Sequence, residues 1–389
     1  MKTVVSRELV VRGTSEERAR QQAAVSGPLL EEAVRAFSGL PFVPQMPGRA
    51  RRALVRGVLH GLGGVYLRRH RPALANHAGG KYWRALQALA GGFGVSPSYA
   101  YGFGAFEVVA SKMSFGLGCS SLAFAAGSTS VDRPILAYNH DFPPAFAPFA
   151  RVRRNLPSDG HASLSLSYPI LLGAIGGVND AGLAVSLNHA WSTEFPRVPA
   201  VPITMLVQDA LDRCASVDEA VALFLDTPVP NGSMVTLVDA AGNRAVVELA
   251  PTLKRVRKTD GPILHAFNHY LDPDMQRIEV PQGAIGTGTI KGMDIHGPNV
   301  ARQRRFDALR PELPARLGPA DLDRLMADHD DGAGSSNTLC RHADPLSETI
   351  VSAILDPVGR SLRVAFGHAC NTPRQVFELE PEGRATLAA

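Results

Sequence analysis

The sequence predicts an α+β layered sandwich with a helical N-terminal segment. Three observations support this class: helical periodicity dominates the first third of the chain, short strand-like apolar runs begin at Cys119, and the later helices come in blocks rather than after each strand. A parallel sheet would instead alternate strands with helices. We therefore expect two parts, a helical segment over residues 1–118 and a β-rich core over residues 119–389.

The helical segment is divided by its prolines and glycines. The first helix is expected over residues 15–37, because three prolines at positions 41, 44 and 47 then interrupt the pattern. Further helices are expected over residues 49–67 and 82–90, the last ending before Gly91-Gly92.

The β-rich core is expected to consist of short apolar strands separated by Gly, Asn, Asp and Pro. The predicted strands are residues 120–126, 135–138, 163–168, 183–187, 234–238, 245–249, 263–267, 350–355 and 362–366. Residues 239–243 have the composition of a hairpin turn. Helices are expected over residues 202–226, 299–313 and 319–329.

Charge is distributed unevenly along the 389 residues, with a net +10 over residues 1–118 and −6 over residues 119–389. Residues 33–105 hold no acidic residue but contain a cluster of seven arginines, Arg49, Arg51, Arg52, Arg56, Arg68, Arg69 and Arg71. A solvated helical face is the favoured interpretation of this basic cluster, and an anion-binding site is the alternative. The cluster lacks the interleaved aromatics of a nucleic-acid-binding motif, so we expect no nucleic-acid partner.

Composition also indicates whether the chain spans a membrane and in which cellular compartment it is expected. Three uncharged stretches, residues 85–106, 113–131 and 161–179, contain too many Gly, Ser and polar breaks for a bilayer-spanning helix, and we expect no membrane span. Four cysteines, Cys119, Cys214, Cys340 and Cys370, are scattered without a CxxC pair, and the first residues lack an apolar leader. A reducing, cytoplasmic setting is therefore expected.

The dipeptide Gly118-Cys119 is the strongest candidate for chemistry. If the chain is cut between these residues, Cys119 carries a thiol and an α-amine, which supply a nucleophile and a base together. A thiol titrates at about 8.5 and an α-amine at about 7.7–8, so the amine can take the thiol proton at neutral pH. Before the cut, the same sulfur can attack the Gly118 carbonyl and form a thioester. The alternative interpretation of Cys119 is a small buried core residue.

Polar residues that follow strand-like runs are candidates to assist this nucleophile. Asp141 can orient the new α-amine, and Asn188 and Asn268 can donate to an oxyanion. Arg341 can hold a substrate carboxylate or stabilise a thiolate. The alternative for Asp141, Asn188 and Asn268 is that each caps a turn or a strand. The alternative for Arg341 is an ordinary surface position.

Metal and serine chemistry are the competing enzyme classes. No G-x-S-x-G element is present, which argues against a serine hydrolase. The candidate metal ligands are not spaced as HxxxH or HExxH on a helix, and we expect no metal site and no cofactor. Those candidates are His140, Asp141, His189, His265, His269 and His342.

Five motifs, taken in order, resemble the C45 peptidase family, the acyl-coenzyme A:6-aminopenicillanic acid acyltransferase-like branch of the N-terminal nucleophile (Ntn) hydrolases. The likeness covers about residues 115–375 and extends more distantly to choloylglycine hydrolases and penicillin V acylases. The motifs are Gly118-Cys119-Ser120-Ser121, Asn139-His140-Asp141-Phe142, the run from Gly177 to Asn188, Phe267-Asn268-His269 and Thr338-Leu339-Cys340-Arg341-His342.

This resemblance implies an αββα four-layer sandwich, self-cleavage between Gly118 and Cys119, and cleavage or transfer of an acyl group from an amide or thioester. Cys119 would be the nucleophile, Asp141 would lie near its amine, Asn188 and Asn268 would stabilise the oxyanion, and Arg341 would line the pocket. The cleaved halves are expected to stay associated. Acyl-coenzyme A is a candidate substrate rather than a cofactor.

Tyr138, His140 and His269 are the expected substrate-binding residues. Tyr138 stands where choloylglycine hydrolases have an Arg before the Asn-x-Asp element, and His140 stands where the acyltransferase has a Trp. Penicillin-type recognition therefore does not carry over, and residues 1–114 are expected to shape the pocket. Assembly into a homo-oligomer is left open. The alternative from another class is a non-catalytic protein of this fold that binds an anionic ligand through the basic cluster.

Overall fold

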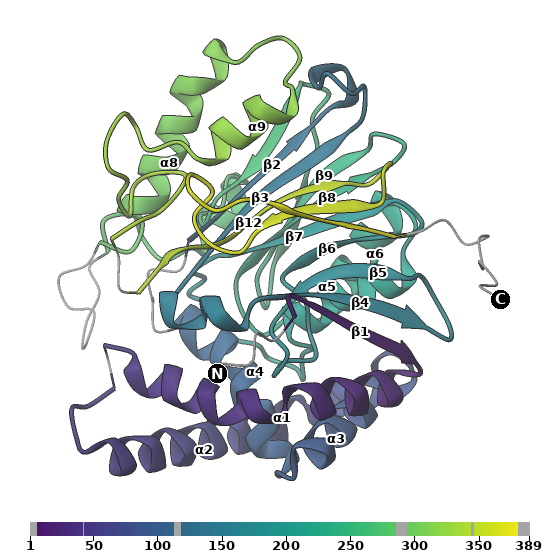
Figure 1. Ribbon diagram of the computed structural model, residues 1–389, viewed down its shortest axis with the longest axis vertical. Coiled ribbons are helices and arrows are strands. Elements are labelled where there is room, and N and C mark those ends of the chain that lie inside the picture. The colour runs from purple at the N-terminus through teal and green to yellow at the C-terminus, as the bar shows by residue number, and fades with distance from the viewer. Residues whose placement is uncertain (1–5, 42, 113–117, 285–293, 344–345, 380–389) are drawn as a thin grey trace.

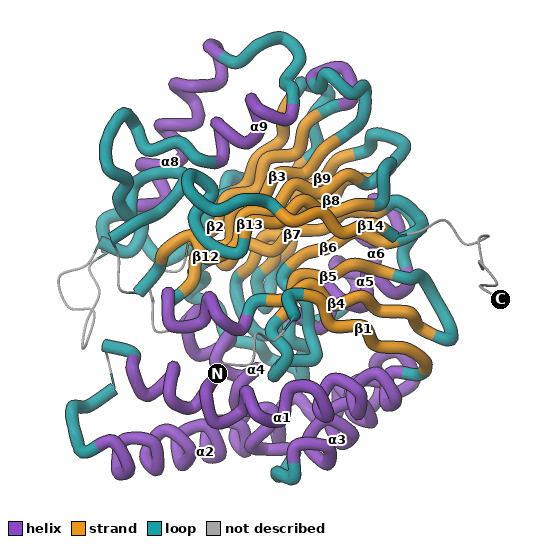
Figure 2. Tube along the Cα trace, in the orientation of Figure 1, coloured by secondary structure: helices purple, strands orange, loops and turns teal. Residues whose placement is uncertain are grey.

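The computed structural model describes residues 6–41, 43–112, 118–284, 294–343 and 346–379, with the backbone alone for residues 105–112. Its strands form two stacked sheets, and helices cover the outer face of each (Figure 1). A layer of N-terminal helices lies across one end of this sandwich (Figure 2).

Within the described residues the larger sheet has eight strands, in the order β1-β4-β5-β6-β7-β8-β9-β10. Its neighbours are antiparallel except β1 and β4, which are parallel. The strands are β1 (Glu8–Gly13), β4 (Arg151–Pro157), β5 (Ser163–Ser167), β6 (Gly176–Asn179), β7 (Leu183–His189), β8 (Ser233–Asp239), β9 (Arg244–Leu249) and β10 (Lys254–Arg257).

The smaller sheet has six strands among the described residues, in the order β11-β2-β3-β12-β13-β14, and all of its pairs are antiparallel. The strands are β2 (Gly118–Phe124), β3 (Ile135–Phe142), β11 (Ile263–Ala266), β12 (Glu348–Asp356), β13 (Ser361–Ala365) and β14 (Gln375–Glu378). Two adjacent inner strands, β2 and β3, carry the candidate nucleophile and the candidate carboxylate.

The helices fall into three groups. The N-terminal layer contains α1 (Ser15–Gly39), α2 (Gly48–Asn76), α3 (Lys81–Phe93) and α4 (Pro97–Lys112). Helices α5 (Ile203–Arg213) and α6 (Val217–Asp226) cover the larger sheet, and α8 (Gly297–Leu309) and α9 (Pro319–Met326) cover the smaller one. A short helix, α7 (Pro273–Gln276), follows β11.

Alternation of side chains along the strands divides the apolar core into layers. Leu136 of β3 and Leu164 of β5 belong to the core between the two sheets. On the outer face of the larger sheet, Val185 belongs to the cluster that includes Phe224 of α6. On the outer face of the smaller sheet, Leu122 belongs to the cluster that includes Phe306 of α8. The chain thus forms a helix–sheet–sheet–helix sandwich, built by burying both faces of each sheet.

Most elements predicted from the sequence are present, and the differences have local causes. The expected helix over residues 202–226 is two helices, because Ser216 caps α6 by accepting a hydrogen bond from the Glu219 N–H. Strand β6 was not among the predicted strands, because its glycines are typical of a turn. A Cβ on Gly177 would collide with the Leu164 carbonyl and lie 2.8 Å from Leu211 of α5, so glycine allows the helix to approach the sheet.

The N-terminal segment is mainly helical, as expected, but it also contains strand β1, which the sequence analysis did not anticipate. Leu9 and Val11 are buried and alternate with exposed residues. Two alternating apolar residues are too short a pattern to predict a strand from the sequence. Because β1 pairs with β4, the N-terminal segment contributes to the same sheet as residues after Cys119. No described helix is long and apolar enough to cross a bilayer.

Candidate active site

Antiparallel pairing of β2 and β3 brings the predicted nucleophile and carboxylate together. Gly118 pairs with Asp141, and Cys119 pairs with His140. Because paired residues of an antiparallel sheet project to the same face, Cys119 and His140 face the space between the sheets, whereas Asp141 faces the helix-covered side. The site therefore has an inner side with the thiol and an outer side with the carboxylate.

The Cys119 thiol is buried, with two ring side chains beside it. Its Sγ lies 3.6 Å from His140 Nδ1 and 3.7 Å from the Tyr138 hydroxyl. Burial, together with the negative charge of Asp141, raises the pKa of Cys119 to about 12. In the uncut chain this thiol is therefore protonated at neutral pH.

His140 is a neutral imidazole held by two tyrosines. Burial lowers the pKa of His140 to about 3. The Tyr168 hydroxyl lies 2.9 Å from Nε2, and the Tyr138 oxygen lies 3.1 Å from Nδ1. The Tyr138 hydroxyl donates its proton to the Leu187 carbonyl at 2.7 Å, so the Tyr138 oxygen can only accept from His140. We therefore assign the imidazole proton to Nδ1, where it points to Tyr138 and Cys119.

The backbone of Cys119 is held at both ends by side chains. Its N–H donates to Asn268 Oδ1 at 2.6 Å, and its carbonyl accepts from Arg302 Nη1 at 2.7 Å. Asn268 is itself oriented, because its Nδ2 donates to the His189 carbonyl at 2.8 Å. Asn268 thus contacts the nitrogen that would become the α-amine.

Asp141 lies between a hydroxyl and two guanidinium groups. Its Oδ1 accepts from Thr349 Oγ1 at 2.6 Å, and its Oδ2 lies 3.8 Å from Arg302 Nη1 and 4.0 Å from Arg341 Nε. Burial raises the pKa of Asp141 to about 6, although Arg341 and Arg302 oppose the shift. Among the described residues Oδ2 accepts no hydrogen bond, so an acceptor remains beside Gly118.

Arg302 is a residue of this site that the sequence analysis did not single out. It is fully buried, and besides the Cys119 carbonyl it donates to Ser120 Oγ at 3.0 Å, Asn268 Oδ1 at 3.0 Å and Asn299 Oδ1 at 2.6 Å. Asn299 and Arg302 are three residues apart and share one face of α8. The sequence shows that spacing, but nothing in it distinguishes Arg302 from the neighbouring Arg304 and Arg305.

Gly118 fits the site because it has no side chain. A Cβ at this position would collide with Arg341 Nη1 and lie 2.9 Å from Asp141 Oδ2 and 3.0 Å from Arg302 Nη2. The two arginines and the carboxylate therefore close around the bond that precedes Cys119. Arg341 also donates to Ser347 Oγ at 3.0 Å.

Two of the predicted site residues, Asn188 and His269, make their described contacts away from the Cys119 thiol. Asn188 Oδ1 accepts from Ser121 Oγ at 2.5 Å, and its Nδ2 donates to the Ala266 carbonyl at 3.1 Å, which links the two sheets. His269 is buried next to the Asn268 backbone, and burial lowers its pKa to about 4. Their roles at the oxyanion and in substrate binding remain predictions.

An apolar cavity of about 60 Å³ opens beside His140. Aromatic and aliphatic side chains line it, among them Phe142 at the end of β3, Phe146 after that strand, and Tyr168. Helices α1 and α4 contribute Phe37 and Phe103, whose rings lie 5.8 Å apart. The N-terminal segment thus contributes to the cavity wall, as the sequence analysis expected.

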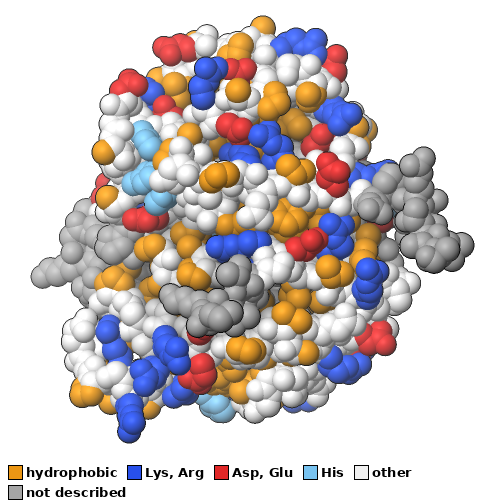
Figure 3. Space-filling view, in the orientation of Figure 1, with side chains coloured by type: hydrophobic (Ala, Val, Ile, Leu, Met, Phe, Trp, Pro, Cys, Tyr) orange, Lys and Arg blue, Asp and Glu red, His pale blue; other side chains and the backbone are white. Residues whose placement is uncertain are grey.

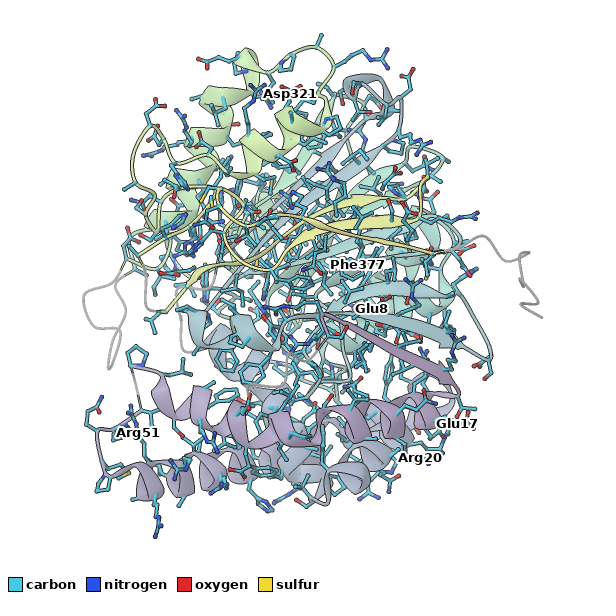
Figure 4. All side chains as sticks on the ribbon, viewed as in Figure 1. Glu8, Glu17, Arg20, Arg51, Asp321 and Phe377 are labelled. Carbon is cyan, nitrogen blue, oxygen red and sulfur yellow. The ribbon has the colours of Figure 1, made fainter. Side chains whose placement is uncertain are left out.

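The basic cluster lies along α2. Several of its arginines already have partners within the chain: Arg56 pairs with Glu31, Arg51 donates to the Val43 carbonyl at 2.8 Å, and Arg71 lies over the Trp83 ring. Figure 4 places Arg51 at the opposite end of the helical layer from Glu17 and Arg20.

Comparison with protein families identifies the chain. Residues 128–371, more than half of the protein, match the model of the acyl-coenzyme A:6-aminopenicillanic acid acyl-transferase family. The chain belongs to this family. The matched segment contains Asp141, Asn188, Asn268, Arg302 and Arg341, whereas Cys119 lies nine residues before its start. The resemblance stated from the five motifs is confirmed at the level of the family.

Solved structures similar to this family member include a variant of the conjugated bile acid hydrolase of Clostridium perfringens, with 13% identity and a TM-score of 0.42, covering 67% of this chain and 97% of that one. The penicillin V acylase of Agrobacterium tumefaciens has 15% identity and a TM-score of 0.42, covering 67% and 86%. A Caenorhabditis elegans ortholog of N-acylethanolamine-hydrolyzing acid amidase has 15% identity and a TM-score of 0.42, covering 62% and 93%. No curated protein matched the sequence.

Proposed function

We propose that this protein is a self-processing cysteine Ntn amidohydrolase or acyltransferase, with Cys119 as its nucleophile. The observation that carries the proposal is the position of Cys119 at the start of β2. Its N–H is held by Asn268 Oδ1 at 2.6 Å, and its thiol lies against His140, which lines the apolar cavity. Membership of the acyltransferase family supports acyl chemistry at this site.

The proposed self-cleavage begins at the Gly118 carbonyl. The Cys119 sulfur attacks this carbon, the C–N bond breaks, and the thiol proton passes to the leaving nitrogen. Water then hydrolyses the thioester, which leaves a Gly118 carboxylate, a free thiol and an α-amine on Cys119. Asp141 Oδ2 and Asn268 Oδ1 are acceptors for the new amine, and the guanidinium groups of Arg302 and Arg341 favour the developing negative charge.

In the cleaved enzyme the α-amine takes over the role of base. It accepts the thiol proton as sulfur attacks the substrate carbonyl, and it returns that proton to the departing amine. The acyl group is then bound to sulfur as a thioester, and water or an amine removes it. The cavity lined by Phe37, Phe103 and Phe146 favours an apolar acyl chain at this stage.

Choloylglycine hydrolases have an arginine immediately before the Asn-x-Asp element, and this chain has Tyr138 at that position. A positive charge nevertheless reaches the carboxylate from other parts of the chain, because Arg302 comes from α8 and Arg341 precedes β12. We propose that these two arginines supply the electrostatic environment of the amine. Strand β1, which pairs with β4 from the other side of the cut, would keep the cleaved halves together.

The test is the mass and reactivity of the purified wild-type protein. We expect two fragments of roughly 13 and 29 kDa, scaled by residue count from 41.4 kDa, and an N-terminal sequence that begins at Cys119. A panel of N-acyl amino acids, N-acyl ethanolamines and penicillins, with and without an added amine acceptor, separates hydrolysis from transfer. Protein that remains a single 389-residue chain while it turns over any of these substrates would contradict self-processing.

The raised pKa of Cys119 predicts how the thiol responds to pH. Thiolate is the reactive form, so with a pKa of about 12 the alkylation of Cys119 by iodoacetamide in uncut chain should be slow at neutral pH and rise about tenfold per pH unit up to about pH 10. In cut chain the α-amine assists, and we expect rapid labelling at neutral pH. Peptide mapping of both forms measures the rates.

Cys214 provides an internal control for this experiment. It is buried, and burial raises its pKa to about 12 as well, but no cut precedes it. Its labelling should follow the steep pH dependence in cut and uncut protein alike. Equal rates for Cys119 and Cys214 in cut protein would show that the new amine does not activate the thiol.

A further inference from the structure

Two cysteines and two histidines meet outside the proposed active site. One ligand atom from each of His329, Cys340, His342 and Cys370 lies within 4.8 Å of all the others. His329 follows α9, Cys340 and His342 precede β12, and Cys370 follows β13. Three segments of the chain therefore converge on one point, and Figure 3 shows a group of histidine side chains at the upper left of the view.

The distances from both sulfurs to His342 fit a tetrahedral ion, and every other pair of donor atoms lies within 4.8 Å. With metal–sulfur and metal–nitrogen bonds of about 2.3 and 2.0 Å, the ligand atoms of a tetrahedral zinc site lie about 3.3–3.8 Å apart. Cys340 Sγ and Cys370 Sγ each lie 3.4 Å from His342 Nε2. His329 Nε2 is buried and has no hydrogen-bond partner, so it is available as a fourth donor.

Surrounding contacts hold the donors in place. The His342 ring stacks on His368 at 3.8 Å between centroids, and His368 Nε2 lies 3.2 Å from a carboxylate oxygen of Glu348. Gly334, in the left-handed region at φ 85°, leaves room for the His342 ring, because a Cβ there would lie 2.6 Å from it. The Cys340 N–H donates to the Asp328 carbonyl at 3.2 Å, which joins the segments of His329 and Cys340.

We propose that His329, Cys340, His342 and Cys370 form a structural Zn²⁺ site. Two thiols and two imidazoles are a donor set that zinc prefers, and four protein ligands complete its coordination. Binding releases two thiol protons to solvent, and the two thiolates balance the charge of the ion. Cys370 is exposed, which gives the ion a path into the site.

The site has a consequence for the active centre because Cys340 and His342 flank Arg341. The Arg341 backbone is fixed to β12 on one side, since its N–H donates to Thr349 Oγ1 at 2.9 Å and its carbonyl accepts from the Thr349 N–H at 3.2 Å. An ion held by the residues before and after it would fix this segment from the other side. The zinc site would therefore position Arg341 beside Gly118 and Asp141.

The test is the metal content of purified wild-type protein and of two ligand variants, Cys370→Ser and His329→Ala. We expect about one zinc per chain in the wild type and a loss of at least tenfold in bound zinc in each variant. Cys214→Ser and His161→Ala are the matched controls, because both positions lie outside the cluster, and both should keep the metal. Cys119→Ala should also keep it, which separates this proposal from the proposed function.

Cobalt provides a second measurement that does not depend on the folding of a variant. Metal-free wild-type protein titrated with Co²⁺ should develop the visible bands of a tetrahedral cobalt thiolate at one equivalent, and Zn²⁺ should displace them. Wild-type protein that contains no zinc and shows no such bands would overturn the proposal. A Cys340–Cys370 disulfide in protein purified without oxidant, seen as a mass lower by about 2 Da, would also overturn it.

Discussion

Replacing Cys119 with alanine should abolish both self-cleavage and acyl chemistry. The change removes the sulfur that forms the thioester in both proposed reactions, and loss of a covalent nucleophile typically lowers kcat by about 10⁴–10⁶-fold. Cys119→Ala should therefore migrate as one intact chain and show no measurable turnover on substrates of the wild type. Intact-mass measurement and the substrate panel provide the two readouts.

Cys214→Ala is the matched control for this experiment. Cys214 is also a buried free cysteine, but it lies at the end of α5, far in the sequence from the candidate site. This variant should be cut and should keep the activity of the wild type. Cleavage of Cys119→Ala at the same bond, or its undiminished activity, would remove the basis of the proposed function.

Replacing Arg302 with methionine should have the largest effect on stability. The guanidinium donates to four acceptors: the Cys119 carbonyl, Ser120 Oγ, Asn268 Oδ1 and Asn299 Oδ1. It also lies 3.8 Å from the Asp141 carboxylate, so its removal leaves buried polar groups and a buried charge without this partner. We expect a loss of about 3–5 kcal/mol in the free energy of unfolding, together with loss of self-cleavage.

The Arg302 measurement is clearest in the Cys119→Ala background, where the chain stays intact and urea unfolding can be followed on a single polypeptide. Arg304→Met is the matched control, because Arg304 belongs to the same helix but is exposed. Its unfolding midpoint should match that of the parent. An Arg302→Met midpoint equal to that of Arg304→Met would show that the buried guanidinium does not stabilise the site.

Much of the fold could be predicted from local patterns. Strands β2 and β3 are short apolar runs between turn residues, and α1 begins and ends within two residues of its predicted limits. The pattern did not predict β1, whose apolar face is only Leu9 and Val11, or β6, whose glycines resemble a turn. In both cases the neighbouring strand, rather than the local sequence, decides the structure.

The candidate site could be predicted where its residues lie on strands or directly after them. Cys119 and Asp141 lie on adjacent paired strands, and Asn268 follows the strand on the other side of β2, so a sheet brings them together once the pairing is known. Arg302 could not be predicted in this way. Its helix carries Arg304 and Arg305 as well, and only the packing of α8 on the smaller sheet decides which of them is buried.

The sequence by itself determined which family the chain resembles, and the family model confirms that resemblance. The order of the glycine–cysteine dipeptide, the Asn-x-Asp element and the strand-end amides indicates the family, because nucleophile and hydrogen-bonding groups are properties of residue type. Only the tertiary structure decided which charges meet these groups. Arg302 and Arg341 reach Asp141 from segments far along the chain, and the four donors of the proposed zinc site, His342 among them, come from three segments. Such convergence depends on how helices and loops pack on the sheets, and no short-range pattern in the sequence encodes it.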